Sequence, residues 1–334
     1  MGRMEGLGFS LQKEAELETL TLDVLKSSEI EGEKLPADQV RSSIARRLGL
    51  ETAGSVAADR DVEGVVEMML DATQNFAQPL SDERLFGWHA ALFPTGRSGM
   101  RKIIVGAWRD DAHGPMQVVS GPAGKEKVHY EAPAAALLPK EMSAFVAWAN
   151  GADDKTDAVL RAALAHLWFV TIHPFDDGNG RIARAIADWQ LARSENSTQR
   201  FYSMSAQIRL ERNDYYEILE RTQKGSLDVT PWMTWCLGCL GRAFDGTETT
   251  LAAVLRKARF WDSLARVAIN ERQRAILNGL LDGFDGKLTT KKWAAITKCS
   301  HDTALRDIQS LIENGILKQD EGGGRSTSYS LSLE

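Results

Sequence analysis

One short stretch constrains this chain more than any other feature: His173-Pro-Phe-Asp-Asp-Gly-Asn-Gly-Arg181-Ile-Ala-Arg184. Apolar residues at helical spacing precede it, from Leu160 to Trp168, and others follow it, from Ile182 to Trp189. The first helix should end near His173, because the residue before a proline avoids the α-helical conformation. The sequence therefore predicts a tight loop that opens directly into a second helix.

The glycines of this loop predict a binding site for an anion. Gly178 and Gly180 allow positive φ angles, so that successive N–H groups can point into one concavity. That concavity lies at the start of a helix, where free N–H groups and the helix dipole favour negative charge. Arg181 and Arg184 are three residues apart and share a helix face. Two guanidinium groups beside such a nest suit a di- or triphosphate.

Two further side chains point to phosphate chemistry. Asp177 adds a carboxylate where phosphates would lie, and its natural use there is to hold a divalent cation such as Mg²⁺. A neutral His173 can take a proton from an incoming hydroxyl group as the bond to phosphorus forms. Phe175 is expected to pack inward and fix the loop. A plain helix connection with solvated charges is the alternative, but the whole combination favours phosphate chemistry.

The loop resembles the signature of the Fic family, His-x-Phe-x-(Asp/Glu)-Gly-Asn-(Gly/Lys)-Arg-x-x-Arg, and matches it at every fixed position. The similarity extends over most of the chain, because Gln117–Gly121 and Val128–Pro133 resemble the family's flap. The resemblance implies a mainly α fold, with a Fic-type helical core and a small β-hairpin flap. It also implies a protein AMP-transferase, which moves AMP from ATP to a Ser, Thr or Tyr hydroxyl group and releases pyrophosphate.

The resemblance implies a role for each residue of the site. His173 would be the general base, Phe175 the anchor of the loop and Asp177 the Mg²⁺ ligand. Relatives with lysine at the eighth motif position resemble a kinase-like branch, so that Gly180 favours AMP transfer. The residues implied in nucleotide binding are Val118, Val119, Phe175, Gly178, Asn179, Gly180, Arg181, Arg184, Tyr216 and Gln223.

A second motif precedes the core. Ser27-Ser-Glu-Ile-Glu31-Gly32 resembles the family's inhibitory pattern, (Ser/Thr)-x-x-x-Glu-(Gly/Asn). Ser27 and Glu31 are four apart and share a helix face. The resemblance implies an N-terminal inhibitory helix whose Glu31 pairs with Arg184. Ser28-x-x-Glu31 is also a capping box, which is the alternative interpretation. Agreement with the first motif favours inhibition.

The chain is too long for one ordinary core. We predict an N-terminal helical segment with the inhibitory motif (1–75), a Fic core (76–245), a helical linker (246–269) and a C-terminal winged-helix domain (270–334). A break in the helices is expected at Asp245–Thr250. Short strands are expected at Lys102–Trp108, Met116–Ser120 and Lys127–Tyr130.

The last domain is predicted as three helices, near 272–281, 290–297 and 302–314, followed by a β-ribbon. Winged helices commonly read DNA with their third helix. Here that helix carries Asp302, Asp307 and Glu313 against Arg306, so that protein docking or dimer packing is at least as well supported as DNA binding. A formal net charge of -6 also argues against a protein that coats nucleic acid.

Composition sets the compartment and the partners. The three cysteines cannot form a disulfide framework, which favours a reducing compartment, and Cys236 and Cys239 are interpreted as core residues rather than as a zinc half-site. The N-terminus lacks the apolar core of a signal peptide, and no apolar run approaches the ~18 residues of a membrane helix. We predict a cytoplasmic protein.

The target protein is expected to dock as a strand on the flap. Self-modification is also expected, and a homodimer is compatible with the same interpretation.

Three functions stay open on the sequence. The first is an autoinhibited AMP-transferase. The second is a DNA-binding regulator whose Fic core senses a nucleotide, and the third is removal of AMP at the same site, with Glu31 positioning water. The intact His173 favours the first over the second, because a sensor needs to bind phosphate but has no need of a base.

Overall fold

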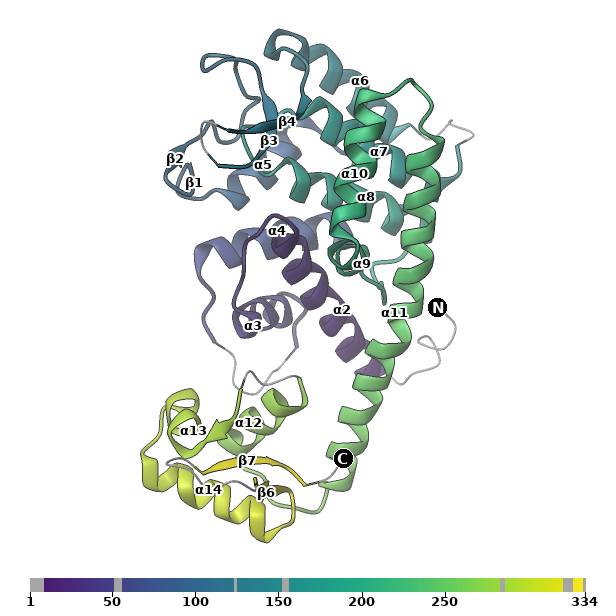
Figure 1. Ribbon diagram of the computed structural model, residues 1–334. Coiled ribbons are helices and arrows are strands. Elements are labelled where there is room, and N and C mark those ends of the chain that lie inside the picture. Colours follow the sequence, from purple (N-terminus) through teal and green to yellow (C-terminus); the bar gives the residue numbers. More distant parts are fainter. Residues whose placement is uncertain are drawn as a thin grey trace. The chain divides into compact units, whose positions relative to one another are not determined.

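The computed structural model describes residues 9–50, 56–122, 125–151, 156–282, 286–320 and 327–332. In these ranges the chain is mainly helical, as predicted, and its strands are short (Figure 1). It divides into two compact units. The first holds Met1–Leu48 and Ala57–Thr250, and the second holds Gly49–Val56 and Leu251–Glu334. No helix of the described ranges is both long enough and apolar enough to cross a bilayer.

The first unit begins with four helices: α2 (Phe9–Ile30), α3 (Ala37–Arg47), α4 (Arg60–Gln74) and α5 (Asp82–Leu92). Leu17, Leu20 and Val24 lie at helical spacing on one face of α2 and are at most 5% exposed. Gly32 ends the segment with a φ of 86°, a left-handed conformation that glycine adopts without strain. The chain can therefore turn sharply after α2 and enter α3.

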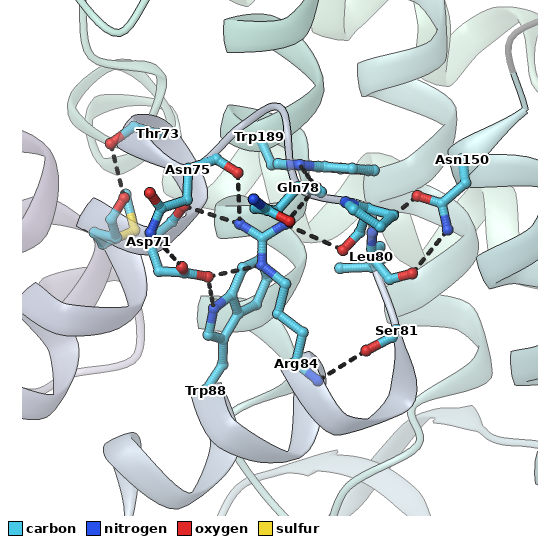
Figure 2. Close-up of polar contacts among 12 residues, drawn as sticks. Asp71, Thr73, Asn75, Gln78, Leu80, Ser81, Arg84, Trp88, Asn150 and Trp189 are labelled. Atoms are coloured by element: carbon cyan, nitrogen blue, oxygen red, sulfur yellow. Dashed lines mark hydrogen bonds and ion pairs between the residues drawn. The ribbon is translucent and has the colours of Figure 1, made fainter.

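Arg84 fixes the early helices to the rest of the unit (Figure 2). Its Nε donates to Asp71 Oδ2 over 2.7 Å, and its Nη1 donates to the carbonyl oxygen of Gln78 over 2.6 Å. The Nε1 atoms of Trp88 and Trp189 donate to these same two residues. Because Trp189 belongs to α8 (Asn179–Glu195), this network joins α4 and α5 to the helix that follows the glycine-rich loop.

The helices of the core follow a β-hairpin. They are η1 (Ala135–Leu137), α6 (Leu138–Asn150), α7 (Ala158–Ile172), α8 (Asn179–Glu195), α9 (Met204–Leu210), α10 (Arg212–Lys224) and α11 (Thr230–Ser263). α7 and α8 pack against each other at the centre. The aromatic side chains of Phe145, Phe169, Phe175 and Trp189 are fully buried there. The loop between these two helices thus rests on a rigid core.

The strand predictions are partly right. β3 (Gln117–Ser120) pairs with β4 (Lys127–Glu131) in an antiparallel hairpin, and β1 (Arg97–Ser98) pairs with β2 (Arg101–Lys102). The strand expected at Lys102–Trp108 is wrong beyond its first residue. Its backbone donors bind side chains instead, since the N–H groups of Ile104 and Gly106 donate to Asp176 and His89.

The helix break expected at Asp245–Thr250 is also wrong, because α11 is continuous from Thr230 to Ser263. Glycine and threonine lower helix propensity by only up to about 1 kcal/mol each, and the helical turns on either side of this stretch outweigh so small a cost. Cys239 of the same helix is fully buried, which fits its interpretation as a core residue.

The second unit contains α12 (Glu271–Leu281), β5 (Leu288–Thr289), α13 (Thr290–Thr297), α14 (His301–Glu313), β6 (Leu317–Gln319) and β7 (Ser328–Leu331). The three predicted helices are therefore present. Its strands form an antiparallel sheet in the order β5-β7-β6. Trp293, Ile308 and Leu311 lie in its core. Asp307 points to α12, where Arg272 Nε donates to it over 2.7 Å.

Candidate active site

The loop between α7 and α8 has the conformation that its glycines predict. His173 caps α7 in the left-handed region, with a φ of 52°, and Gly178 precedes α8 with a φ of 78°. A Cβ atom at Gly178 would lie 2.9 Å from the ring of Phe93, so that a larger residue does not fit. The turn therefore brings the first N–H groups of α8 next to the histidine.

Phe175 anchors this loop, as expected. Its side chain is fully buried, and its ring stacks on His89 with 4.1 Å between the centroids. Asn179 closes the loop from the other side, because its Nδ2 donates to the carbonyl oxygen of Phe175 over 2.8 Å while its Oδ1 accepts from the Phe175 N–H over 3.0 Å. The side chain of Asn179 is thus committed to the loop itself.

His173 is placed to act as a base. Its Nδ1 lies 3.2 Å from the carbonyl oxygen of Val170, which requires the proton on Nδ1 and leaves the lone pair on Nε2. Burial lowers the pKa of His173, so that the neutral imidazole is favoured. Arg109 holds this residue from behind, with its Nε donating to the His173 carbonyl oxygen over 2.8 Å.

Arg109 also connects the loop to the flap. Its Nη2 donates to the carbonyl oxygen of Pro133 over 2.6 Å, just after β4, and its own N–H donates to the carbonyl oxygen of Pro174 over 3.0 Å. The residue is 3% exposed. The sequence analysis missed it, because no local pattern separates this arginine from a surface charge.

The two arginines of the motif are nearly fully buried, at 3% and 2% exposure for Arg181 and Arg184. Burial opposes the charge of Arg184, but the Glu31 carboxylate beside it leaves the pKa of Arg184 above its usual value. Among the described residues, Arg181 Nε and Arg184 Nη1 have no hydrogen-bond partner. Buried donors of this kind suit an anion with several acceptor oxygens, such as a polyphosphate.

The structure brings Ser27 and Glu31, the residues of the predicted inhibitory motif, to Arg184. Glu31 Oε1 accepts from Arg184 Nη2 over 2.8 Å, and Ser27 Oγ accepts from Arg184 Nε over 2.9 Å. Glu31 directly follows the last residue of α2, so that the capping-box interpretation, which requires a helix start, is wrong. An ideal Cβ at Gly180 would lie 2.2 Å from Glu31 Oε1. Glycine at this motif position therefore makes room for the carboxylate.

A second carboxylate, which the sequence analysis missed, binds the other arginine. Glu33 Oε2 accepts from Arg181 Nη1 over 2.6 Å. Burial raises the pKa of Glu33, Arg181 opposes this effect, and the carboxylates of Asp177 and Glu31 add to it. The segment after α2 thus places two negative side chains against the two arginines of the loop.

The remaining site residues surround this centre. Asp177 Oδ1 accepts from the Gly178 N–H over 2.5 Å, and its Oδ2 accepts from the hydroxyl group of Ser98. Tyr216 of α10 donates to Glu31 Oε2 over 3.3 Å, and Gln223 Nε2 donates to Thr171 Oγ1 over 3.3 Å. Val118 and Val119 lie on β3, where Val119 is 47% exposed.

The described residues contain no group of three or more His, Cys, Asp and Glu side chains that could enclose a metal ion. A Mg²⁺ ion bound with a nucleotide needs no such cage, because it is commonly held by one or two carboxylates together with phosphate oxygens and water. Asp177 supplies one carboxylate beside the anion nest. The donor set therefore fits Mg²⁺ bound as a complex with ATP.

A buried helix N-terminus, two buried arginines and an imidazole favoured in its neutral form are an arrangement that suits a phosphate-bearing ligand. Residues 79–191 match the Fic/DOC family. Residues 1–50, which include Ser27–Gly32, match a domain of unknown function, DUF4172.

Named relatives cover the same domain. The protein adenylyltransferase Fic of Nematostella vectensis is 35% identical over 114 residues, which is 34% of this chain and 25% of that protein. The protein adenylyltransferase Fic of Drosophila yakuba is 33% identical over 105 residues, which is 31% of this chain and 20% of that protein. The chain thus spans a quarter or less of the length of these relatives.

Solved structures share the fold. A Fic family protein from Desulfovibrio desulfuricans has a TM-score of 0.50 at 20% identity, covering 99% of this chain and 90% of that one. A Fic domain-containing signalling protein from Bacteroides thetaiotaomicron has a TM-score of 0.54 at 21% identity, covering 77% and 93%. At these identities the likeness concerns the fold.

Proposed function

We propose that this protein transfers AMP from ATP to a hydroxyl group of a protein and that Glu31 holds the site inactive. The observation that carries the proposal is the state of the two motif arginines. Both are buried, each has a nitrogen without a partner in the described structure, and one is bound by the Glu31 carboxylate. The names of the Nematostella and Drosophila relatives support the same reaction.

His173 would take the proton of the target hydroxyl group on Nε2, because Nδ1 is committed to Val170. The hydroxyl oxygen forms a bond to the α-phosphorus of ATP, the bond to the bridging oxygen breaks, and pyrophosphate leaves. Arg181, Arg184 and the first N–H groups of α8 would hold the phosphates. Asp177 would hold Mg²⁺, which supplies positive charge to the phosphate oxygens.

Glu31 would inhibit by occupying Arg184. With this arginine bound to Glu31 and Ser27, it is not available to the γ-phosphate of ATP. ATP could still enter the site, but its triphosphate would lie in the wrong place, and the α-phosphorus would not face the hydroxyl group in line. Phosphoryl and nucleotidyl transfer depend on such alignment more than on binding alone.

The experiment is incubation of Glu31→Gly and the unaltered protein with labelled ATP and Mg²⁺, alone and in cell lysate. We expect strong incorporation of AMP into protein by Glu31→Gly and weak incorporation by the unaltered chain. Glu31→Asp, whose carboxylate is one methylene shorter, should fall between them. His173→Ala in the Glu31→Gly background is the control and should be silent while still binding ATP. A folded Glu31→Gly protein that labels nothing would contradict the proposal.

The second unit supports a separate proposal, that it is a winged-helix module. The element order helix, strand, helix, helix, strand, strand and the sheet order β5-β7-β6 support it. Asp307 of α14 pairs with Arg272, so its charge is turned toward α12 and partly neutralised. A mobility-shift assay with duplex DNA at low salt tests for DNA binding. Absence of a shift there would favour protein docking, since phosphate contacts are strongest at low salt.

A further inference from the structure

The β3–β4 hairpin contains an irregularity at its centre. Val118 pairs with Tyr130 and Val119 pairs with Val128, so that His129 has no partner across the hairpin. An extra residue of this kind is a β-bulge, and bulges re-aim side chains beside active sites. His129 is therefore the one residue of β4 that the pairing leaves free to point elsewhere.

His129 uses this freedom to join two elements. Its Nε2 lies 2.6 Å from Ser120 Oγ on β3, and its Nδ1 lies 2.6 Å from Glu220 Oε2 on α10. Lys224 and His129 together lower the pKa of Glu220 to about 2, so that its carboxylate stays charged. The imidazole thus bridges β3 of the flap and α10 of the core.

The neighbouring residue makes a second attachment. Tyr130 donates its hydroxyl proton to the carbonyl oxygen of Thr171 on α7 over 3.0 Å. In a regular strand, successive side chains point to opposite faces. Because of the bulge, His129 and Tyr130 both reach core helices, one α10 and the other α7. The hairpin is therefore held at two points rather than one.

An isolated two-stranded hairpin is marginally stable in water. A target segment that adds to the edge of β3 needs that strand in one fixed place, because its hydrogen bonds are made to the main chain. We propose that His129 is a positioning residue that holds β3, through Ser120 and Glu220, in the place where the target protein docks. The inference rests on the proposed function. It identifies the contact of His129 with Ser120 and Glu220 as the one that sets the affinity of the enzyme for its protein substrate.

The test uses Glu31→Gly as the enzyme and a second, silent copy of the chain, His173→Ala, as the protein acceptor. We expect His129→Ala in the enzyme to raise the KM for this acceptor about tenfold, the effect of roughly 1.4 kcal/mol from two lost hydrogen bonds. The kcat and the dissociation constant of Mg-ATP, measured by calorimetry, should stay within about twofold. Unchanged KM, or a loss confined to kcat, would overturn the inference.

Conservative variants separate the two arms of the bridge. In His129→Asn, the amide nitrogen takes the place of Nδ1 and can still donate to Glu220, whereas in His129→Gln it takes the place of Nε2 near Ser120. Each should restore part of the acceptor affinity. Lys127→Ala is the matched control, since Lys127 lies on the same strand and 3.9 Å from Glu220 but takes no part in the bridge. An equal effect of Lys127→Ala would argue for a general charge effect.

The order Ser120, His129, Glu220 is also that of a nucleophile, a base and an acid. Mass spectrometry of the labelled enzyme addresses this reading. If AMP is found on Ser120, Ser120→Ala should abolish this label. If the KM for the acceptor is also unchanged in Ser120→Ala, then Ser120 is a modification site and the positioning role is refuted.

Hydrogen exchange makes the inference independent of activity. In the otherwise unaltered chain, His129→Ala and Glu220→Ala should speed exchange of the amides of 117–120, and Lys127→Ala should not. Exchange that is unchanged in all three would overturn the attachment itself. If Glu31→Gly labels no protein while exchange responds as expected, the proposed function fails and the attachment of the flap stands.

Discussion

Two buried carboxyl groups join α2 to α8, and we expect them to make part of the folding stability depend on pH. Asp23 and Asp188 are 2% and 1% exposed. Asp188 Oδ1 accepts from Arg200 Nη2 over 2.6 Å, and Asp23 Oδ1 accepts from the N–H of Ser205 over 3.2 Å. Their Oδ2 atoms have no hydrogen-bond partner among the described residues, and the charge of Asp23 disfavours a second negative charge on Asp188. We expect two buried carboxyl groups that interact in this way to share a proton.

The sign and size of the effect follow from this proton. Burial raises the pKa of Asp188 from 3.8 to about 8, Arg200 opposes the rise and Asp23 adds to it. Stability from a raised pKa is fully present below the unfolded value and is lost as pH rises toward the folded value. Between the two pKa values the native state binds one more proton than the unfolded state. The contribution therefore falls by about 1.4 kcal/mol per pH unit and levels off above the folded pKa.

The variant Asp188→Asn isolates the contribution of this carboxyl group to the pH dependence of stability. The amide of the variant can donate to Asp23 permanently while its oxygen still accepts from Arg200, and it does not titrate. Urea unfolding of both proteins, followed by tryptophan fluorescence from about pH 5 to about pH 9, gives the difference in stability. We expect the free energy of unfolding of the variant to rise relative to that of the parent as the pH increases to about 8. A difference that stays constant, or that falls with pH, would refute the shared proton.

Three further predictions follow from single contacts. Gly64→Ala should destabilise the first unit by about 3 kcal/mol, because its Cβ would lie 1.8 Å from the carbonyl oxygen of Ala91. The control Gly87→Ala, whose Cβ would have nothing within 4 Å, should be neutral or stabilising, and thermal unfolding of the two variants compares their stabilities. Asp177→Ala should lose the Mg²⁺-dependent part of ATP binding in calorimetry, and unchanged Mg-ATP affinity would remove Asp177 from the metal site. Val119→Pro should impair protein labelling with ATP affinity intact, since proline removes a donor from β3; full activity would count against strand docking.

The loop could be predicted from the sequence because its chemistry is local. Proline after His173 and glycine at 178 determine where α7 ends and α8 begins, and Phe175 is buried as expected. The pairing of Glu31 with Arg184 joins residues 153 positions apart. Only the resemblance of two motifs to one family suggested it, and helical spacing alone would have left Glu31 as a surface charge.

The contacts that the sequence analysis missed share one property. Arg109 with His173, Glu33 with Arg181, and Asp23 with Asp188 each join distant parts of the chain, and no periodicity encodes such pairs. The two wrong predictions of secondary structure have the opposite origin. Local propensity favoured a strand at Lys102–Trp108, where side chains from distant segments take the backbone donors, and a break at Asp245–Thr250, where the helix continues despite a small cost in propensity.

The approach of Glu31 to Gly180 links two positions that are far apart in the sequence. Any side chain at 180 would have to share space with the carboxylate, since even a Cβ atom would lie 2.2 Å from Glu31 Oε1. A descendant of this chain could therefore not acquire a bulky residue at 180 and keep Glu31 where it is. If Glu31 inhibits as proposed, one substitution at 180 would both change the chemistry of the loop and displace the inhibitory carboxylate, so that altered specificity and release from inhibition would be a single evolutionary step.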